Sequence, residues 1–270
     1  MENMFNKELI AMLHVQALPG TPKNHLTMNK IIDYTLREAE LYLKFGITTL
    51  IIENMHDIPY LNRDVGPEIT ASMTIIAYEL KKRFPINLGI QILAGANEDA
   101  LASAFCSGAN FIRAEGFVFS HVADEGMMDS CAGQLLRYRK ALGAEQVKII
   151  TDIKKKHSAH ALTADVDIVE TAKAAEFFTA DGLIITGAST GMSANLDELK
   201  SVKENVNIPV LIGSGINEEN LETYLQYADG LIVGSYLKES GYWANDLSVE
   251  RVKRVMASYQ SCLSGRISTT

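Results

Sequence analysis

Short runs of apolar, often β-branched residues alternate along this chain with longer segments of helical periodicity. Eight such runs occur, and each predicts a buried β-strand. They span Leu9–Val15, Ile47–Glu53, Ile86–Ile92, Phe111–Glu115, Val147–Ile153, Gly182–Thr186, Pro209–Gly213 and Gly230–Gly234. Between them, apolar side chains recur at i, i+3 and i+4 in Met28–Phe45, Glu68–Phe84 and Val166–Phe178, which predicts amphipathic helices.

Eight strand-helix repeats in a chain of 270 residues predict an α/β fold, the (β/α)8 TIM barrel, which typically has about 250 residues. The main alternative is a doubly wound open sheet. That fold usually carries a G-x-G-x-x-G fingerprint after its first strand, and His14–Pro22 lacks one. No linker divides the chain, so we expect a single domain over residues 1–270. The tail from Ser258 lacks a sustained apolar stripe, and we expect it to be flexible from about residue 259.

The chain carries 25 Lys and Arg against 33 Asp and Glu, a formal charge of −8. Nucleic acids and anionic membranes bind basic surfaces, so neither is expected as the main partner. No apolar run approaches the roughly 20 residues of a membrane span, and no leader pattern precedes Leu9. We expect a cytoplasmic protein without membrane insertion, in which the three separated cysteines are reduced. Barrels often associate, so a homo-oligomer is among the expected states.

Polar residues gather at the carboxyl ends of six predicted strands, where barrels of this kind place their sites. They are His14; Glu53 and Asn54; Gln91; Arg113 and Glu115; Asp152 and Lys154, with Lys156 and His157 after them; and Thr186 and Gly187. Period-two alternation puts Arg113 and Glu115 on one face of their strand, and Asp152 and Lys154 on one face of theirs. The structural alternative is a ring of satisfied ion pairs at the barrel mouth.

The last two strands run into glycine-rich turns, Gly213-Ser214-Gly215 and Gly234-Ser235. In barrels, main-chain N–H groups of these two loops commonly bind phosphate, and glycine lets the anion approach the backbone closely. A single glycine-rich turn usually has no binding function. Two of them at the same position in consecutive strand-helix units predict a phosphate site. We include Gly187, after the sixth strand, in the same candidate set.

The segment Thr151–His160 concentrates charge where a short loop would suffice. Asp152 is a candidate general base, or a ligand for a divalent cation, the one cofactor that the sequence suggests. Lys154 is a candidate to orient a phosphate or carbonyl group, or to form a Schiff base. The structural alternative is a solvated basic loop with a structural aspartate.

The segment Phe117–Gly126 combines apolar and charged residues outside any periodic element. One interpretation is a lid over the barrel mouth that excludes water, with Ser120, His121, Asp124 and Glu125 facing inward. The other is that its aromatic side chains pack on the barrel top without moving.

Several motifs resemble the BtpA/SgcQ family. They are His14-Val15 with Ala17–Pro22, Glu53-Asn54, Val65–Glu68, Asp124–Gly126, Thr186-Gly187 with Thr190-Gly191, and Gly213–Gly215. The resemblance covers nearly the whole chain and implies a barrel of the phosphate-binding type, without a catalytic assignment. Many family members have an Asn-Arg-Asn-like stretch after the third strand; here Leu93–Asn97 differs, which suggests the SgcQ-like subgroup, associated with sugar-uptake genes, over the photosynthetic namesake.

Three functions are compatible with these residues. The first is an enzyme of carbohydrate metabolism that acts on a small phosphorylated molecule, a sugar phosphate, as an isomerase or epimerase by proton transfer or as a lyase by aldol-type cleavage. Asp152, Glu53 or Glu115 would move the proton, and Lys154 with Arg113 would stabilise negative charge. The second is a non-catalytic assembly or stability factor. The third is a nucleotide-binding or hydrolytic barrel.

Overall fold

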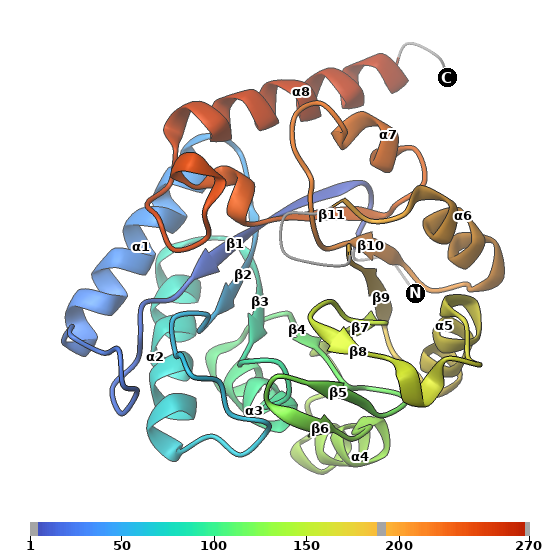
Figure 1. The fold of residues 1–270 in the computed structure, drawn as a ribbon. Coiled ribbons are helices and arrows are strands. Elements are labelled where there is room, and N and C mark those ends of the chain that lie inside the picture. The colour runs from blue at the N-terminus through green and yellow to red at the C-terminus, as the bar shows by residue number, and fades with distance from the viewer. Residues whose placement is uncertain (1–4, 188–192, 268–270) are drawn as a thin grey trace.

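The computed structural model of the chain describes residues 5–187 and 193–267. Eight parallel strands close into a barrel in the order β1, β2, β3, β4, β7, β9, β10, β11 (Figure 1). Their bounds are β1 Glu8–His14, β2 Thr49–Glu53, β3 Asn87–Gln91, β4 Phe111–Ala114, β7 Lys148–Ile153, β9 Gly182–Ile185, β10 Val210–Ile212 and β11 Gly230–Val233. Each lies inside a predicted run or extends one residue beyond it, and the closed sheet confirms the (β/α)8 barrel.

Helices surround the barrel on its outside (Figure 1). They are α1 Met28–Lys44, α2 Pro67–Arg83, α3 Asn97–Ser107, α4 Ala132–Leu142, α5 Ile168–Phe177, α6 Leu196–Asn205, α7 Leu221–Leu225 and α8 Val249–Ile267, with short 3-10 turns η1 Ala161–Thr163, η2 Ser235–Leu237 and η3 Glu239–Gly241. The three helices predicted from periodicity are α1, α2 and α5. The last helix, α8, continues to Ile267, and the Tyr259 hydroxyl donates to the Lys7 carbonyl. The flexibility of the chain from about residue 259 stays a prediction.

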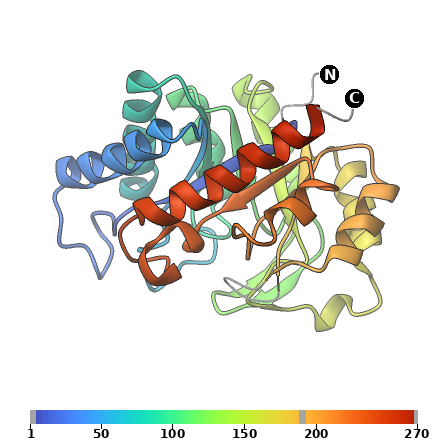
Figure 2. The same ribbon diagram turned by 90° about the horizontal axis from the view of Figure 1, so that it is seen from above.

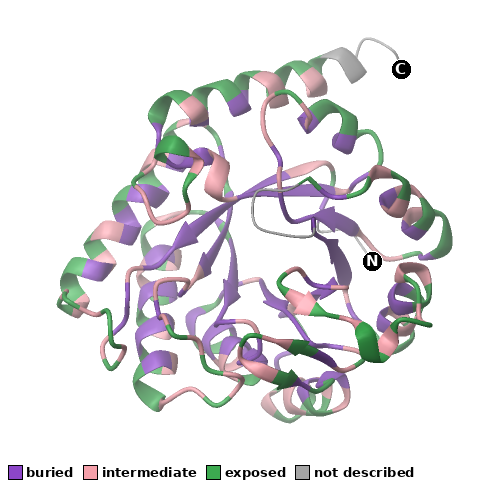
Figure 3. Ribbon diagram, in the orientation of Figure 1, coloured by how far each residue is buried: buried purple, intermediate pink, exposed green. Residues whose placement is uncertain are grey.

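The apolar core has two layers, because each strand alternates between the barrel interior and the helices. On β1, Ile10 and Met12 belong to the inner cluster, whereas Leu9, Ala11 and Leu13 pack in the outer one. The inner cluster also contains Phe5, Ile51, Phe111, Ile150, Ile184, Leu211 and Ile232. Figure 3 shows this as buried strands inside helices whose outer faces are exposed. Burying one such side chain contributes about 1.5–3 kcal/mol.

A second, antiparallel sheet forms from segments that follow β4 and β7. It consists of β5 His121–Ala123, β6 Gly126–Met128 and β8 Ser158–Ala159, in the order β6, β5, β8. Figure 2 shows it at one end of the barrel. The predicted lid segment contributes β5, and its Phe117 is buried in the outer core while Phe119 is exposed. The apolar part of that segment therefore anchors it to the barrel top.

None of the described helices is long and apolar enough to cross a bilayer.

Candidate functional site

A cavity of about 470 Å³ opens at the carboxyl ends of the barrel strands. Its walls include ten residues that the sequence singled out. These are His14, Glu53, Arg113, Glu115, His157, Gly213, Ser214, Gly215, Gly234 and Ser235. The other six candidates, Asn54, Gln91, Asp152, Lys154, Thr186 and Gly187, do not line it. Most of the candidates therefore line the cavity, and the exceptions have identifiable causes.

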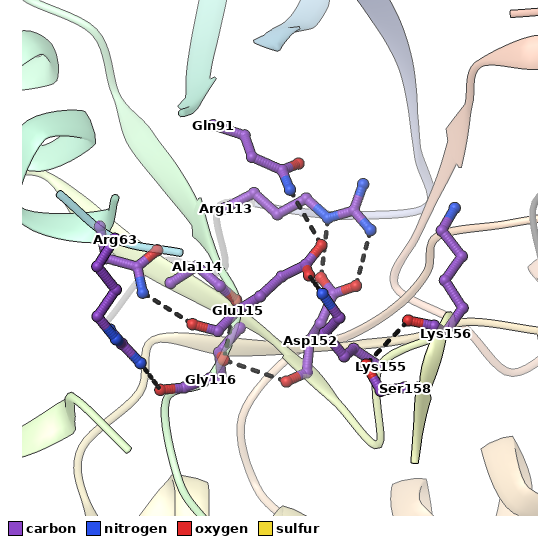
Figure 4. Close-up of polar contacts among 12 residues, drawn as sticks. Arg63, Gln91, Arg113, Ala114, Glu115, Gly116, Asp152, Lys155, Lys156 and Ser158 are labelled. Atoms are coloured by element: carbon purple, nitrogen blue, oxygen red, sulfur yellow. Dashed lines mark hydrogen bonds and ion pairs between the residues drawn. The ribbon is translucent and has the colours of Figure 1, made fainter. Parts of the chain in front are cut away.

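Arg113 on β4 and Asp152 on β7 form a buried, bidentate ion pair (Figure 4). Arg113 Nε donates to Asp152 Oδ1 at 2.8 Å, and Nη2 donates to Oδ2 at 2.7 Å. Burial opposes the charged guanidinium, but the carboxylates of Asp152, Glu115 and Glu53 raise the pKa of Arg113 above its ordinary value. Asp152 therefore holds Arg113, which faces the cavity, in a fixed orientation.

This pairing changes the expected role of Asp152. Both of its carboxylate oxygens accept hydrogen bonds from Arg113, its side chain is fully buried, and it does not line the cavity. Within residues 5–187 and 193–267, no group of three or more His, Cys, Asp or Glu side chains is arranged to hold a metal ion. The geometry gives Asp152 a positioning role.

Glu115, which follows β4, is the centre of a second buried polar cluster. Lys155 forms an ion pair with Glu115 Oε2 at 2.9 Å, and Gln91 Nε2 donates to Oε1 at 3.0 Å. Burial works against ionisation, but Lys155 and Arg113 hold the pKa of Glu115 below its ordinary value. Glu115 is thus a fixed carboxylate whose two oxygens already have partners. Gln91 is a supporting residue behind the cavity wall.

Glu53, at the end of β2, differs from the other two carboxylates. It lines the cavity, and its carboxyl group has no hydrogen bond or ion pair with any described residue. Burial raises the pKa of Glu53, and the nearby Glu115 carboxylate adds to this, against the opposing effect of Arg113. A carboxyl group with this raised pKa and no such partner is suited to accept and return a proton.

The loop after β7 turns its three lysines in different directions. Lys154 has a left-handed backbone with φ +49°, and its amino group donates to the Thr163 carbonyl at 3.0 Å. The period-two alternation that placed Lys154 beside Asp152 fails because the strand ends at Ile153. Lys155 binds Glu115, and Lys156 lines the cavity instead of Lys154.

His14 ends β1 and packs against Trp243, which lies in the segment after β11. The Nδ1 atom of His14 is 3.1 Å from the Trp243 carbonyl oxygen. Because a carbonyl only accepts, Nδ1 carries the proton and Nε2 keeps its lone pair. Burial, helped by the charge of Lys238, lowers the pKa of His14 to about 3. The imidazole is therefore neutral at physiological pH.

The two glycine-rich turns contribute main chain to the cavity wall, as the sequence predicted. At Gly213 a Cβ atom would lie 2.5 Å from Ile184 Cγ2, so packing alone requires glycine there. Gly215 has φ +68°, a conformation that side chains disfavour. At Gly234 a Cβ atom would lie 3.2 Å from Met12 Cγ. The turns therefore have structural reasons for glycine in addition to any role in binding an anion.

The remaining candidates support the site from behind. Asn54 is fully buried, accepts from the Leu93 N–H at 2.8 Å and donates to Asp57 at 2.7 Å, which ties the β2 and β3 loops together. Thr186 and Gly187 are buried after β9. Thr190-Gly191, part of the family motif, lie outside the described residues.

Sequence reasoning gave no role to three aromatic residues of the wall, Tyr60, Tyr236 and Trp243, and named Lys156 without giving it a role. The ring of Trp243 makes edge contacts with His14 and His56, at centroid distances of 6.1 and 4.8 Å. Its status as the single tryptophan, placed after the last strand, is the signal that could have drawn attention to it. Asp124 and Glu125, expected to face inward, do line the cavity.

Comparison with known sequences identifies relatives along almost the entire chain. The sequence profile of the BtpA family matches residues 5–261. An uncharacterized mitochondrial protein of Caenorhabditis elegans is 52% identical over 253 residues, which cover 92% of this chain and 91% of that protein. The photosystem I biogenesis protein BtpA of Synechocystis is 32% identical over 239 residues, covering 86% and 81%.

Comparison with solved structures identifies barrels of similar shape. Thiamine phosphate pyrophosphorylase from Pyrococcus furiosus matches with a TM-score of 0.58 and 14% identity, over 95% of this chain and 96% of that one. Phosphoribosyl anthranilate isomerase from Thermus thermophilus matches with a TM-score of 0.57 and 15% identity, over 94% and 98%. At such identities the likeness concerns the fold.

Proposed function

The chain belongs to the BtpA family, and we propose that it is an enzyme that acts on a small phosphorylated metabolite of the sugar phosphate class. The reaction is an isomerisation or epimerisation by proton transfer, or an aldol-type cleavage. The observation that carries this proposal is the cavity itself, where the carboxyl group of Glu53 and the amino group of Lys156 share a wall with two glycine-rich turns. The similar barrels that bind or make phosphorylated compounds, by their names, support the substrate class.

Each part of the wall has a separate task in this proposal. Main-chain groups of Gly213–Gly215 and of Gly234-Ser235 bind the phosphate. Glu53 moves the proton, and the fixed cation of Arg113 stabilises negative charge that develops on the substrate. Glu115 and Asp152 hold Lys155 and Arg113 in place.

The name of the cyanobacterial relative suggests the alternative, a non-catalytic assembly factor. Burying ionisable groups without partners costs stability, and such groups are typical of catalytic sites. A factor that only presents its surface has no use for them, so the carboxyl group of Glu53, unpaired among the described residues, favours an enzyme. We also propose that the chain lies nearer the SgcQ-like subgroup, because Leu93–Asn97 differs from the Asn-Arg-Asn-like stretch of many family members.

A thermal-shift panel tests the proposal. It compares sugar phosphates, their unphosphorylated parents and nucleotides, each with and without a divalent cation. A ligand at a hundred times its dissociation constant stabilises by about 2.7 kcal/mol, which raises Tm by several degrees. We expect phosphorylated sugars to give this shift and their parents not to do so.

Two glycine variants show where the phosphate binds. Gly215→Asp places a carboxylate at the proposed site and should remove the shift. Gly143→Asp is the matched control, because Gly143 also has a positive φ, +66°, and has open space around it at the end of α4. A panel without any shift by a phosphorylated sugar would contradict the proposed substrate class.

A further inference from the structure

Lys156 presents its amino group to the cavity. It lines the cavity wall, and its amino group has no hydrogen bond or ion pair with any residue in the described ranges. Figure 4 shows its side chain extending beside Arg113, with no contact drawn from the amino group. Lys156 is half-buried. A partly desolvated cation next to another cation, without an ion-pair partner, is costly, so its position indicates a role other than folding.

The two preceding lysines show what structural lysines in this loop do. Lys154 is held by the Thr163 carbonyl at 3.0 Å, and Lys155 by the Glu115 carboxylate at 2.9 Å. Three carboxylates act on the charge of Lys156. Glu115 is engaged by Lys155 and Asp152 by Arg113, and Glu53 forms no ion pair with Lys156. Lys156 is the lysine of this loop that remains available to a bound molecule.

The surroundings of Lys156 favour the neutral amine. Burial lowers its pKa, and the positive charge of Arg113 lowers it further, against the opposing effect of Glu53, Asp152 and Glu115. Each unit by which the pKa falls multiplies the fraction of neutral, nucleophilic amine about tenfold. A desolvated lysine next to a second cation is the arrangement that activates an amine for attack on a carbonyl carbon.

We propose that Lys156 forms an imine with the carbonyl group of the substrate, which is therefore a phosphorylated aldehyde or ketone. This inference rests on the proposed function, because it names the covalent chemistry and the substrate class of the same cavity. The sequence named Lys154 as the candidate for a Schiff base, and our proposal assigns that role to Lys156, two residues later in the chain.

The atoms of this step balance without an added reagent. The Lys156 nitrogen lone pair attacks the carbonyl carbon, a C–N bond forms, and the C=O π pair moves to oxygen, which takes a proton. The nitrogen gives up one proton, which completes the carbinolamine. The carbinolamine hydroxyl then takes a second proton and leaves as water as the nitrogen lone pair forms the C=N bond, and the nitrogen keeps its remaining proton, so the product is the protonated imine. Glu53, which lines the same cavity, is placed to supply and recover these protons.

Imine formation also provides an electron acceptor for a reaction in which Glu53 moves a proton and Arg113 stabilises negative charge. The protonated imine accepts the electron pair released when a bond to the neighbouring carbon breaks. If that bond is C–H, the outcome is an isomerisation or epimerisation, and if it is C–C, the outcome is aldol-type cleavage. Both remain reactions of a carbonyl compound, whereas hydrolysis of a phosphate ester does not need this lysine.

Trapping with borohydride tests the inference on the intact protein. The probes are pyridoxal 5′-phosphate and pyridoxal, two aldehydes that differ only in the phosphate group. Each is incubated with the protein at pH 7.5, the imine is reduced to a stable secondary amine, and the labelled lysines are located by mass spectrometry after digestion at glutamate. We expect Lys156 to carry more label than Lys154, because only Lys156 of the two lines the cavity and burial lowers its pKa.

Two matched variants complete the experiment. Lys156→Arg keeps the positive charge but cannot form an imine, and should lose the label at this position and the visible absorbance of the imine. Lys154→Arg, in the same loop, should keep both. Thermal unfolding of each variant checks that it is folded. Label spread equally over the two lysines, or absent from Lys156 of the wild-type protein, overturns the inference.

The two aldehydes separate this inference from the proposed phosphate site. If both label Lys156 equally and inorganic phosphate does not compete, the imine stands and the phosphate proposal fails. If sugar phosphates raise Tm but neither aldehyde labels Lys156, the phosphate proposal stands and the imine fails. Preferential labelling by the phosphorylated aldehyde, with competition by inorganic phosphate, supports both.

Discussion

Arg113 and Asp152 are joined by two hydrogen bonds, of 2.8 and 2.7 Å, between neighbouring strands β4 and β7. Both side chains are almost completely buried, and only Arg113 of the two reaches the cavity. The pair therefore works as a unit in which the carboxylate fixes the plane of the guanidinium. This relationship makes Asp152 a positioning residue.

Removing one partner of this ion pair should destabilise the protein more than removing both. Asp152→Leu leaves a buried guanidinium without compensation and is expected to cost about 3–5 kcal/mol of unfolding free energy. Urea denaturation of the single variants and of the Arg113→Met/Asp152→Leu double variant measures this as a double-mutant cycle. We expect a coupling energy of about 0.5–3 kcal/mol, and additive losses would show that the pair is not a unit.

Glu53→Gln should remove turnover and stabilise the protein at neutral pH. The folded-state pKa of Glu53 is raised by burial, so the group contributes stability below its ordinary pKa and loses it as pH rises through the folded-state value. Each unit of that rise corresponds to about 1.4 kcal/mol. Tm of the variant and wild type should therefore converge near pH 4 and separate toward pH 8. The control is Glu204→Gln, at an exposed position. An equal gain in Tm for this variant would show that the burial of Glu53 is not the cause.

His14 should make the protein less stable as the solution becomes acidic. Its pKa falls from the ordinary 6.5 to about 3 on folding, so between these values the unfolded chain binds more protons than the folded one. The unfolding free energy should then decrease by up to about 1.4 kcal/mol per pH unit below pH 6.5 from this group. The unfolding free energy of His14→Gln should fall less steeply with decreasing pH than that of wild type, and the exposed His25→Gln should keep the wild-type slope. His56, with a pKa lowered to about 4, adds to the wild-type slope.

Gly89 in β3 should resist enlargement because the ring of Phe111 occupies the space of a side chain. A Cβ atom at Gly89 would lie 2.3 Å from Phe111 Cε2 in the barrel interior. Gly89→Ala is expected to cost about 1–3 kcal/mol, as overpacked cores do. Combining it with Phe111→Leu should recover part of the loss in thermal unfolding experiments. If the double variant loses at least as much stability as the two single variants together, the contact between Gly89 and Phe111 is not the cause of the loss.

Most strands and several helices of the barrel could be predicted from the local pattern of apolar and polar residues. Strands buried on both faces appear as β-branched runs, and amphipathic helices as apolar stripes, so eight strands and the helices α1, α2 and α5 were predictable. Four cavity residues followed directly: His14, Glu53, Arg113 and Glu115 stand at or next to strand ends, where the side-chain direction is fixed by the strand. The end of α8 was not predictable in this way, since its last turns lack the apolar stripe that signals a buried helix.

The residues beyond the strand ends depended on tertiary structure. The sequence alone does not distinguish the roles of Lys154 and Lys156. The backbone turns left-handed at Lys154, so that Lys154 contacts Thr163 and Lys156 lines the cavity. The partner of Asp152 lies 39 residues away, and that of His14 lies 229 residues away. The sequence by itself determined which residues stand at the carboxyl ends of the barrel strands, because strand periodicity is a local property of the backbone. Only the tertiary structure decided which of the described charges neutralise each other and which, as at Glu53 and Lys156, stay available for chemistry, because pairing depends on distances across the closed sheet.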